Sequence, residues 1–234
     1  MPVSDMKTIG MIGGMSWESS AQYYTIINRA VRDRLGGSHS AEILLWSVDF
    51  GPMEARQRAG EWDVLTAQMI DAARRLETGG ADFVMICTNT MHLMAEEVAA
   101  AIHIPLLHVV DPTAEKVIAA GHRKVGLLGT AFTMEKAFYR DRLAAAGLEV
   151  IVPGEDDRRE VHRVIYEELI AGKIEPASRD AYRAILARLV AEGAEAIVLG
   201  CTEIMLLVDQ SDSAVPLFDT TTLHALAAVD LALA

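Results

Sequence analysis

Residues 82–90 read DFVMICTNT, a short apolar run that ends in a cysteine followed at once by a threonine. Residues 196–203 read AIVLGCTE and repeat this arrangement with a second cysteine. Short apolar runs of this kind, bounded by turn-forming residues, predict two buried strands that each end at a cysteine. Cys87 and Cys201 are the 2 cysteines of the 234-residue chain, so we take these segments as the pair around which it is organised.

The rest of the chain repeats the same plan. Three pairs match at an offset of 116: Gly10 with Gly126, Gly13 with Gly129, and Tyr23 with Tyr139. The two cysteines match at an offset of 114. Duplication explains this spacing better than chance. We therefore predict two similar lobes, the first from residues 1–112 joined by a C-terminal helix at 220–234, and the second from residues 113–219.

Strand-like and helix-like segments alternate in both halves. Strands are predicted at 7–14, 42–49, 82–87, 105–109, 124–130, 196–200 and 215–218. Helices are predicted at 16–35, 61–78, 158–171 and 176–192 and from residues 91, 111 and 221 onward, with a polar loop at 50–60. Ser16 is the expected N-cap of the first helix, and Asp111 with Pro112 the expected start of another. This alternation predicts an α/β fold with mostly parallel sheets flanked by helices and a ligand site at the carboxyl ends of the strands.

The composition is that of an ordinary globular protein. Hydrophobic residues make up 51% of the chain, and the formal net charge is -12. Nucleic-acid binding needs clusters of Lys and Arg that acidic neighbours do not outnumber, so we expect no nucleic-acid partner. The sequence shows no leader pattern and no apolar run near the roughly 20 residues that span a bilayer. We therefore expect a cytoplasmic protein with no membrane partner, in which two distant cysteines stay reduced.

Two thiols on opposite sides of one small molecule support a reaction that a single base cannot carry out. One thiolate removes a proton from one face of a carbon atom, and a thiol returns a proton on the other face. An ordinary thiol with a pKa of about 8.5 is mostly protonated at neutral pH, so the site must favour the anion. Each cysteine directly precedes a predicted helix start or turn, where backbone N–H groups favour negative charge.

Polar side chains follow both cysteines. They are Thr88, Asn89 and Thr90 in the first segment and Thr202 in the second. We expect these groups to hold a substrate carboxylate and to stabilise the enolate-like charge that develops when the adjacent proton leaves. Glu203 has two interpretations, contact with a substrate ammonium group or capping of the helix that it begins. His92 and His224 are candidates to assist a thiolate, although a structural role for His92 is the favoured interpretation.

Several motifs together resemble one known family. They are CTNTMH at 87–92, GCTEI at 200–204 and GGMSWE at 13–18, with RLGG at 34–37, SVDF at 47–50, GEWD at 60–63 and LGT at 128–130. The chain resembles the aspartate/glutamate racemase superfamily, and in length and order it is similar to the broad-specificity amino-acid racemase branch. The resemblance implies two pseudo-symmetric α/β lobes, an active site in the cleft between them, no cofactor and a homodimer.

The resemblance also implies an activity and a set of site residues. The activity is interconversion of L- and D-amino acids, either aspartate and glutamate or a broader range, with Cys87 and Cys201 as the acid/base pair. The substrate-binding candidates are Met15, Ser16, Gln57, Thr88, Asn89, Thr90, Thr130, Thr202 and Glu203. Arg56 and Lys173 are weaker candidates for binding a distal carboxylate.

Alternatives to racemisation stay open. Branches with the same cysteine placement include hydantoin racemases, arylmalonate decarboxylases, which usually lack one cysteine, and maleate isomerases, in which one thiolate attacks carbon. A non-catalytic pair of lobes that senses a small acid is a further hypothesis, although a binder needs no paired thiols. The glycines at 10–14 lack the full dinucleotide-binding pattern, and no Cys/His spacing fits a zinc site, so we expect no cofactor and no metal.

Overall fold

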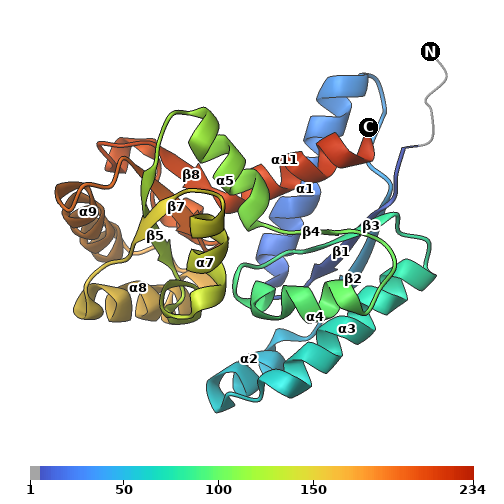
Figure 1. The fold of residues 1–234 in the computed structure, drawn as a ribbon, viewed down its shortest axis with the longest axis horizontal. Helices are drawn as coiled ribbons and strands as arrows, with labels where there is room; N and C mark the ends of the chain where they lie inside the picture. The colour runs from blue at the N-terminus through green and yellow to red at the C-terminus, as the bar shows by residue number, and fades with distance from the viewer. Residues whose placement is uncertain (1–5) are drawn as a thin grey trace. The chain divides into compact units, whose positions relative to one another are not determined.

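The computed structural model describes residues 6–234, which divide into two compact units (Figure 1). Unit 1 takes the described residues up to His108 together with His224–Ala234, and unit 2 is Val109–Leu223. Each unit is built on a parallel four-stranded sheet flanked by helices, so the predicted fold class is confirmed. None of the helices within residues 6–234 combines the length and apolar character that a membrane crossing requires.

The sheet of unit 1 has the strand order β2-β1-β3-β4. Its strands are β1 (Ile9–Gly13), β2 (Ile43–Ser47), β3 (Phe83–Ile86) and β4 (Leu106–Leu107). Its helices are α1 (Trp17–Leu35), α2 (Phe50–Ala59), α3 (Trp62–Thr78), the 3-10 helix η1 (Thr90–Met94), α4 (Ala95–Ala100) and α11 (Thr220–Ala232). Helices α1 and α11 pack on the face that carries Met11 and Met85, whereas α3 and α4 pack on the face that carries Ile12 and Ile86. Successive strand residues point to opposite faces, which is why each strand of apolar residues serves both layers.

The sheet of unit 2 has the equivalent order, β6-β5-β7-β8. Its strands are β5 (Lys124–Gly129), β6 (Glu149–Ile151), β7 (Ala196–Gly200) and β8 (Leu217–Asp219). Its helices are α5 (Val110–Ala119), α6 (Ala131–Glu135), α7 (Ala137–Ala145), α8 (Glu155–Glu167), η2 (Leu169–Ala171), α9 (Pro176–Ala191), α10 (Ile204–Leu207) and η3 (Gln210–Asp212). Helices α5 and α7 cover the face of Leu127 and Val198, and α8 and α9 cover the face of Leu128 and Leu199.

The two units exchange one helix each. Helix α5 follows β4 of unit 1 along the chain, yet its residues Ala114 and Val117 pack in the core of unit 2. Helix α11 follows β8 of unit 2, yet Ala225 and Val229 pack in the core of unit 1 beside Tyr23. Each half of the duplication therefore completes the helix layer of the other half.

The strand register revises the predicted equivalence of the two cysteines. Ile12 pairs with Ile86 in unit 1, and Leu128 pairs with Leu199 in unit 2. Ile12 and Leu128 correspond at the offset of 116 that holds for β1 and β5. It follows that Ile86 corresponds to Leu199, so β3 and β7 correspond at an offset of 113 rather than 114.

This shift of one residue separates the cysteines by face. Cys87 occupies the position of Gly200, and Cys201 occupies that of Thr88. A shift of one residue turns a side chain to the opposite face of a sheet. Accordingly Cys87 lies in the layer with α1 and α11, while Cys201 lies in the layer with α8 and α9. The two thiols each follow a buried strand, as predicted, but they do not occupy equivalent positions in the two sheets.

Two local predictions also need correction. The expected polar loop at 50–60 is helix α2, because Asp49 caps it by accepting from the Gly51 N–H at 3.2 Å and Gly60 ends it at φ 73°. The expected N-cap Asp111 lies inside α5, which begins at Val110; its carboxylate binds Arg142 on α7 at 2.6 and 2.7 Å instead. The predicted N-cap Ser16 is confirmed.

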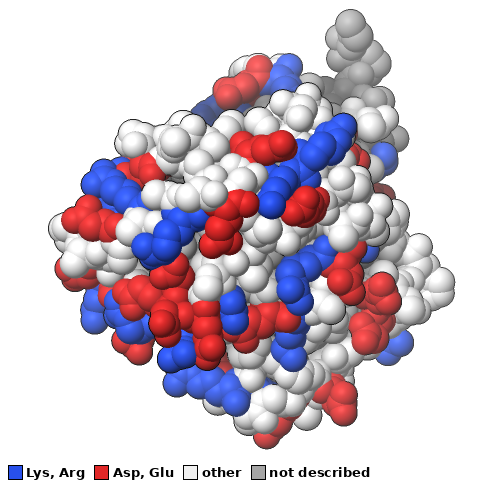
Figure 2. All heavy atoms as spheres, turned by 60° about the vertical axis from the view of Figure 1, so that its left-hand side comes forward, with Lys and Arg blue, Asp and Glu red and all other residues white. Residues whose placement is uncertain are grey.

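Charged side chains of both signs are interspersed over the face shown in Figure 2. On α8, for example, Arg163 binds Glu160 at 2.7 Å and Glu168 at 2.8 Å. These hydrogen bonds hold the pKa of Glu160 below its usual value and that of Arg163 above it. Arg163 therefore forms ion pairs with carboxylates of its own unit.

Candidate active site

In unit 1, the segments that follow β1 and β3 lie at the same edge of the sheet, because these strands are parallel neighbours. The first segment carries Met15 and Ser16, and the second carries the predicted residues 87–90. Met15, Ser16, Asn89 and Thr90 are at most 5% exposed. The sheet thus brings together the unit 1 candidates that lie more than 70 residues apart in the sequence.

The turn after β1 is held by crowding and by serine hydroxyls. Gly14 has a φ of 91°, and a Cβ atom there would lie 2.3 Å from the Val48 carbonyl oxygen, so only glycine fits. The Gly14 N–H donates to Ser20 Oγ at 2.8 Å, and that hydroxyl donates to the Ser16 carbonyl at 3.0 Å. The positions of Met15 and Ser16 are therefore set by groups on both sides of them.

Cys87 continues the sheet beyond β3. Its N–H donates to the Ile12 carbonyl oxygen at 2.9 Å, and its side chain is 0% exposed in the layer that includes Tyr23. Burial raises the pKa of the Cys87 thiol well above its ordinary value. A buried thiolate without water is costly, so Cys87 rests as a neutral thiol.

Three buried histidines, His92, His108 and His224, lie close together in unit 1, and His92 contacts the segment that carries Cys87. His92 Nδ1 lies 2.8 Å from the Thr88 carbonyl oxygen. A carbonyl oxygen can only accept a hydrogen bond, so the proton of this bond is on Nδ1. Its ring lies 4.5 Å from that of His108 and 5.8 Å from that of His224, centroid to centroid. The predicted structural role of His92 therefore has a defined form: it anchors the turn that carries the predicted donors.

His224 belongs to the same group. Its Nε2 lies 2.9 Å from the Leu107 carbonyl oxygen. Because that oxygen can only accept, Nε2 carries the proton. Its Nδ1 lies 3.1 Å from the Tyr23 hydroxyl. These bonds join α11, β4 and α1. The sequence singled out His224 as an aid to a thiolate, and these two hydrogen bonds join its ring to structural groups of unit 1.

The three residues proposed to recognise a substrate side chain have different surroundings in their own units. Gln57 is 4% exposed, and its Nε2 donates to Met91 Sδ at 3.2 Å, directly after the predicted donors. Arg56, one position earlier, lies partly exposed at 3.8 Å from Glu61. Lys173 lies in unit 2, in the exposed segment between η2 and α9. Within unit 1, the contact to Met91 places the Gln57 side chain beside the segment that carries Cys87.

In unit 2, β5 and β7 are parallel neighbours, and Gly129 pairs with Gly200. Thr130 and Cys201 therefore follow directly from the same sheet edge. Thr130 caps α6 by accepting from the Thr133 N–H at 3.3 Å. His162 on α8 accepts from the Ala131 N–H at 3.2 Å, a neighbour of this edge that no motif or spacing in the sequence indicated.

Cys201 lies in a buried polar cluster with Glu203. The Cys201 thiol donates to Glu203 Oε2 at 3.1 Å, and the Thr202 hydroxyl donates to the same oxygen at 2.7 Å. The three residues are between 4% and 7% exposed. Burial raises the pKa of the Cys201 thiol well above its ordinary value, and the negative charge of Glu203 raises it further. Glu203 stands at the N-cap position of α10, but its side chain makes no capping bond there and accepts from the Cys201 and Thr202 side chains instead.

A metal site would require several His, Cys, Asp or Glu side chains close together. Within the described part of the chain, no group of three or more His, Cys, Asp and Glu side chains is placed to hold a metal ion. Both cysteines are free thiols.

Comparison with known proteins relates the whole chain to racemases. It is 27% identical to the broad specificity amino-acid racemase RacX of Bacillus subtilis over 97% of this chain and 98% of that protein. A crystal structure of a candidate Asp/Glu racemase from Yersinia pestis is 50% identical, with a TM-score of 0.92, and covers 98% of this chain and 100% of its own. An aspartate racemase homologue from Pyrococcus horikoshii is 35% identical, with a TM-score of 0.84, over 97% and 99%.

Family membership follows from a match over most of the sequence. The profile of the Asp/Glu/Hydantoin racemase family matches residues 12–228, a range that includes both cysteine segments. The chain therefore belongs to the Asp/Glu/Hydantoin racemase family, and it is an isomerase of the kind that acts on amino acids.

Proposed function

We propose that the chain is a cofactor-independent amino-acid racemase in which Cys87 and Cys201 exchange protons with opposite faces of the substrate α-carbon. The observation that carries the proposal is the 3.1 Å bond from the Cys201 thiol to the buried Glu203 carboxylate. A buried structural cysteine needs no acceptor for its proton. A catalytic thiol that must become a thiolate does.

The carboxylate offers a way to form that thiolate in a buried site. Transfer of the thiol proton to Glu203 gives a thiolate and a neutral carboxyl group, so one negative charge moves and no new charge is created. This matters because an additional buried charge is expensive in a medium of low dielectric constant. The Thr202 hydroxyl, which donates to Glu203 at 2.7 Å, holds the carboxylate in place for the transfer.

Cys87 then serves as the acid of the pair in one direction. The Cys201 thiolate takes the α-proton, the electron pair stays on the α-carbon as an enolate conjugated to the carboxylate, and the Cys87 thiol donates its proton to the other face. The raised pKa of Cys87 keeps it protonated at the start of this step. In the opposite direction the two thiols exchange roles.

The substrate carboxylate is assigned to the polar groups next to the thiols. Thr88, Asn89 and Thr90 offer donors at the sheet edge of unit 1, and Thr202 offers one in unit 2. We further assign the edges of the substrate site to Met15 and Ser16 in unit 1 and to Thr130 in unit 2. Gln57 is the favoured group for a substrate side chain, and Arg56 and Lys173 are weaker candidates.

The substrates are proposed to be aspartate or glutamate or a broader range of amino acids. RacX is described as a broad specificity amino-acid racemase, and the Pyrococcus horikoshii protein as an aspartate racemase homologue. We also propose that the chain works as a homodimer in the cytoplasm without a nucleic-acid or membrane partner. The resemblance of the cysteine motifs and the net charge of -12 support these assignments.

Solvent deuterium tests the activity and the mechanism together. Each proteinogenic amino acid is incubated in heavy water as both enantiomers, and the loss of optical rotation and the gain of α-deuterium are followed. We expect racemisation with deuterium incorporation, and loss of both in Cys87→Ser and in Cys201→Ser. Full racemisation by either single variant contradicts the two-thiol mechanism. Turnover of maleate without α-proton exchange, or binding without any exchange, contradicts racemisation itself.

A further inference from the structure

A groove of ≈ 490 Å³ lies in unit 1 between residues 24–32 of α1 and residues 37–40, in the loop that leads to β2. We call it the α1 groove. The RLGG motif at 34–37 ends at this groove, and the proposed mechanism does not use that motif. Because the loop precedes β2, the groove lies at the amino ends of the strands, whereas the candidate site of unit 1 lies at their carboxyl ends.

Hydrogen bonds hold the loop against α1. The Ala41 N–H donates to Asn28 Oδ1 at 3.0 Å, and Asn28 Nδ2 donates to the Tyr24 carbonyl oxygen at 2.8 Å. The Gly36 N–H donates to the Arg32 carbonyl oxygen at 2.7 Å. The two walls of the α1 groove are therefore fixed to each other before a ligand binds, as is usual for small-molecule sites.

The α1 groove carries two positive charges that have no ion-pair partner among residues 6–234. Arg29 and Arg32 are exposed and lie three positions apart, so they share one face of α1. Within the same residues, no ion pair joins Arg29 to Asp33, four positions further on. The nine residues that line the groove, all of them described, include no Asp or Glu. In a chain with a net charge of -12, this groove is a place that attracts an anion.

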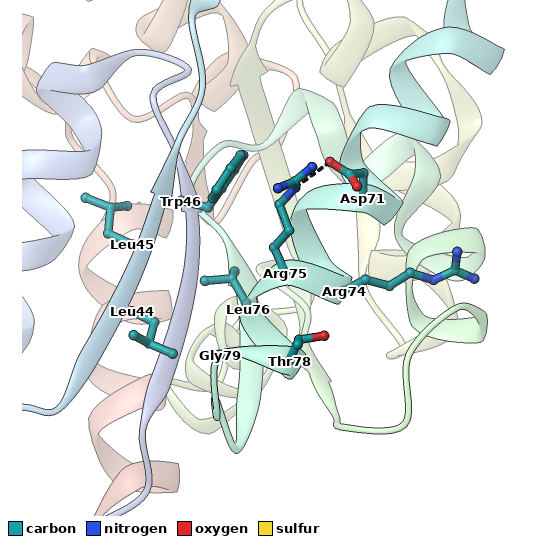
Figure 3. Close-up of a pocket in the computed structure, with 9 residues that line it drawn as sticks. All are labelled: Leu44, Leu45, Trp46, Asp71, Arg74, Arg75, Leu76, Thr78 and Gly79. Carbon is teal, nitrogen blue, oxygen red and sulfur yellow. Dashed lines mark hydrogen bonds and ion pairs between the residues drawn. The ribbon is translucent and has the colours of Figure 1, made fainter.

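Two other grooves of unit 1 hold charges of both signs. Figure 3 shows one of them, lined by Asp71, Arg74 and Arg75, in which Arg75 binds Asp71 at 2.7 Å. The second is lined by Asp49 and Asp71 together with Arg56. Carboxylates offset the arginines in these two grooves, whereas the α1 groove leaves its arginines to bind a ligand.

The loop adds uncharged donors to the two guanidinium groups. The backbone N–H groups of Gly37, Ser38 and Ser40 have no hydrogen-bond partner among residues 6–234, and neither do the Ser38 and Ser40 hydroxyls. A phosphate group accepts hydrogen bonds through several oxygens and matches the planar fork of an arginine. Backbone N–H groups in turns bind phosphate as well. The donor set therefore favours a phosphate over a carboxylate, which has fewer oxygens to accept from it.

We propose that the α1 groove binds a phosphate monoester that carries a planar ring, the chemical class of the nucleoside monophosphates. Arg29, Arg32 and the N–H groups of the loop hold the phosphate. Tyr24 lines the same groove and is 53% exposed, so its ring is available to stack on the ring of the ligand. The volume of ≈ 490 Å³ lies within the range of about 300 to 1,000 Å³ that small-molecule sites occupy, and it exceeds what one phosphate group fills.

The charge around the groove favours a small molecule over a nucleic acid. A nucleic acid binds through many phosphates at once, so it needs positive charge along an extended surface. The next arginine along α1, Arg34, binds Asp230 at 2.6 Å, so the unpaired charge of this helix ends at the groove. The inference does not depend on the proposed racemase activity, and its tests do not measure turnover.

Equilibrium dialysis of the full chain against radiolabelled AMP provides the first test. We expect saturable binding of one AMP per chain, displaced by unlabelled AMP at lower concentrations than by inorganic phosphate or by adenosine. A single-stranded oligonucleotide, compared at equal nucleotide concentration, tests the nucleic-acid alternative. Absence of saturable binding, inorganic phosphate that competes as well as AMP does, or an oligonucleotide that competes better than AMP overturns the proposal.

Arginine substitutions locate the bound AMP. Arg29→Ala and Arg32→Ala should each weaken AMP binding roughly 10-fold, because each removes charge-assisted hydrogen bonds to the phosphate. Arg58→Ala is the matched control, since it removes the same charge from an exposed position on α2 outside the groove and should bind AMP as the wild type does. Equal losses in all three variants, or wild-type affinity in both groove variants, overturn the proposal. Melting temperatures confirm that the variants are folded.

A substitution of Tyr24 separates the ring of the ligand from its phosphate. Tyr24→Leu should weaken the binding of AMP and leave the affinity for inorganic phosphate unchanged, because the leucine keeps an apolar side chain but cannot stack. An unchanged affinity for AMP in this variant overturns the assignment of a ring-bearing ligand.

Discussion

The Cys201 thiol donates a hydrogen bond to Glu203, with Sγ and Oε2 at 3.1 Å and both side chains buried. This contact gives the second cysteine a proton acceptor two residues away. Cys87 instead lies in an apolar layer with Tyr23 and Met85. The two thiols of the duplicated fold are therefore chemically different before any substrate binds.

We expect Glu203→Gln to lower kcat/KM about 100-fold or more, since positioned general bases contribute roughly 10² to 10⁴ to rates. The value of kcat/KM must fall by the same factor for the two enantiomers. The equilibrium constant for their interconversion is one, and it equals the ratio of the two kcat/KM values. The values of kcat for the two enantiomers are free to differ. Initial rates from each enantiomer measure both quantities. An unchanged kcat with a raised KM shows instead that Glu203 binds the substrate ammonium group.

The thiol pKa of Cys201 should fall in the same variant. The negative charge of Glu203 is one of the causes that raise this pKa, so its removal favours the thiolate at any given pH. Ultraviolet absorbance of the thiolate, titrated in a Cys87→Ser background, measures the midpoint. Cys87 in a Cys201→Ser background serves as the control, and its midpoint should not move. A Cys201 midpoint that stays or rises in Glu203→Gln contradicts the assigned interaction.

His92 should act on the reaction through the turn that it anchors. Its Nδ1–H donates to the Thr88 carbonyl at 2.8 Å, and an Asn side chain can present an amide N–H in a similar place. We expect His92→Ala to lower kcat at least 10-fold and His92→Asn to recover most of the loss, because small displacements of positioned groups are costly in rate. Melting temperatures of both variants control for general destabilisation. Equal impairment of Asn and Ala shows that the ring itself, rather than its hydrogen bond, is required.

Gly14 should be far less tolerant of substitution than another glycine with a left-handed backbone. Gly14→Ala places a Cβ atom 2.3 Å from the Val48 carbonyl oxygen, whereas Gly37, at φ 58°, has no atom within 4 Å of that position. Gly37→Ala should lower the free energy of unfolding by about 1 kcal/mol through backbone strain alone. Gly14→Ala should lower it by about 3 kcal/mol or more, because the turn must also move. Denaturant melts measure both, and equal losses contradict the crowding at Gly14.

Much of this protein is readable from its sequence. The glycines at 10 and 126 and the apolar runs before each cysteine predict the central strands, because a buried parallel strand requires a short continuous apolar run. Ser16 predicts a helix start, since capping depends only on the neighbouring backbone. The cysteine motifs predict the racemase family that the comparison of the whole chain shows.

Features that depend on distant contacts were decided by the tertiary structure. The polar composition of residues 50–60 predicts a loop. In the structure this segment is helix α2, whose buried side chains Met53 and Gln57 pack against the rest of unit 1. The lobe division predicted from the sequence already joins the C-terminal helix at 220–234 to the first lobe, but the contacts that hold it there, Ala225 and Val229 packed with Tyr23, are seen only in the tertiary structure.

The two cysteines show most clearly which features the sequence determines and which the tertiary structure decides. The sequence by itself determined that each ends a buried strand and precedes a turn. Only the tertiary structure decided that Cys87 and Cys201 point to opposite faces of equivalent sheets and that Glu203 accepts the proton of one of them. The physical reason is that strand register is set by packing between strands far apart in the chain, and a difference of one residue reverses the direction of a side chain.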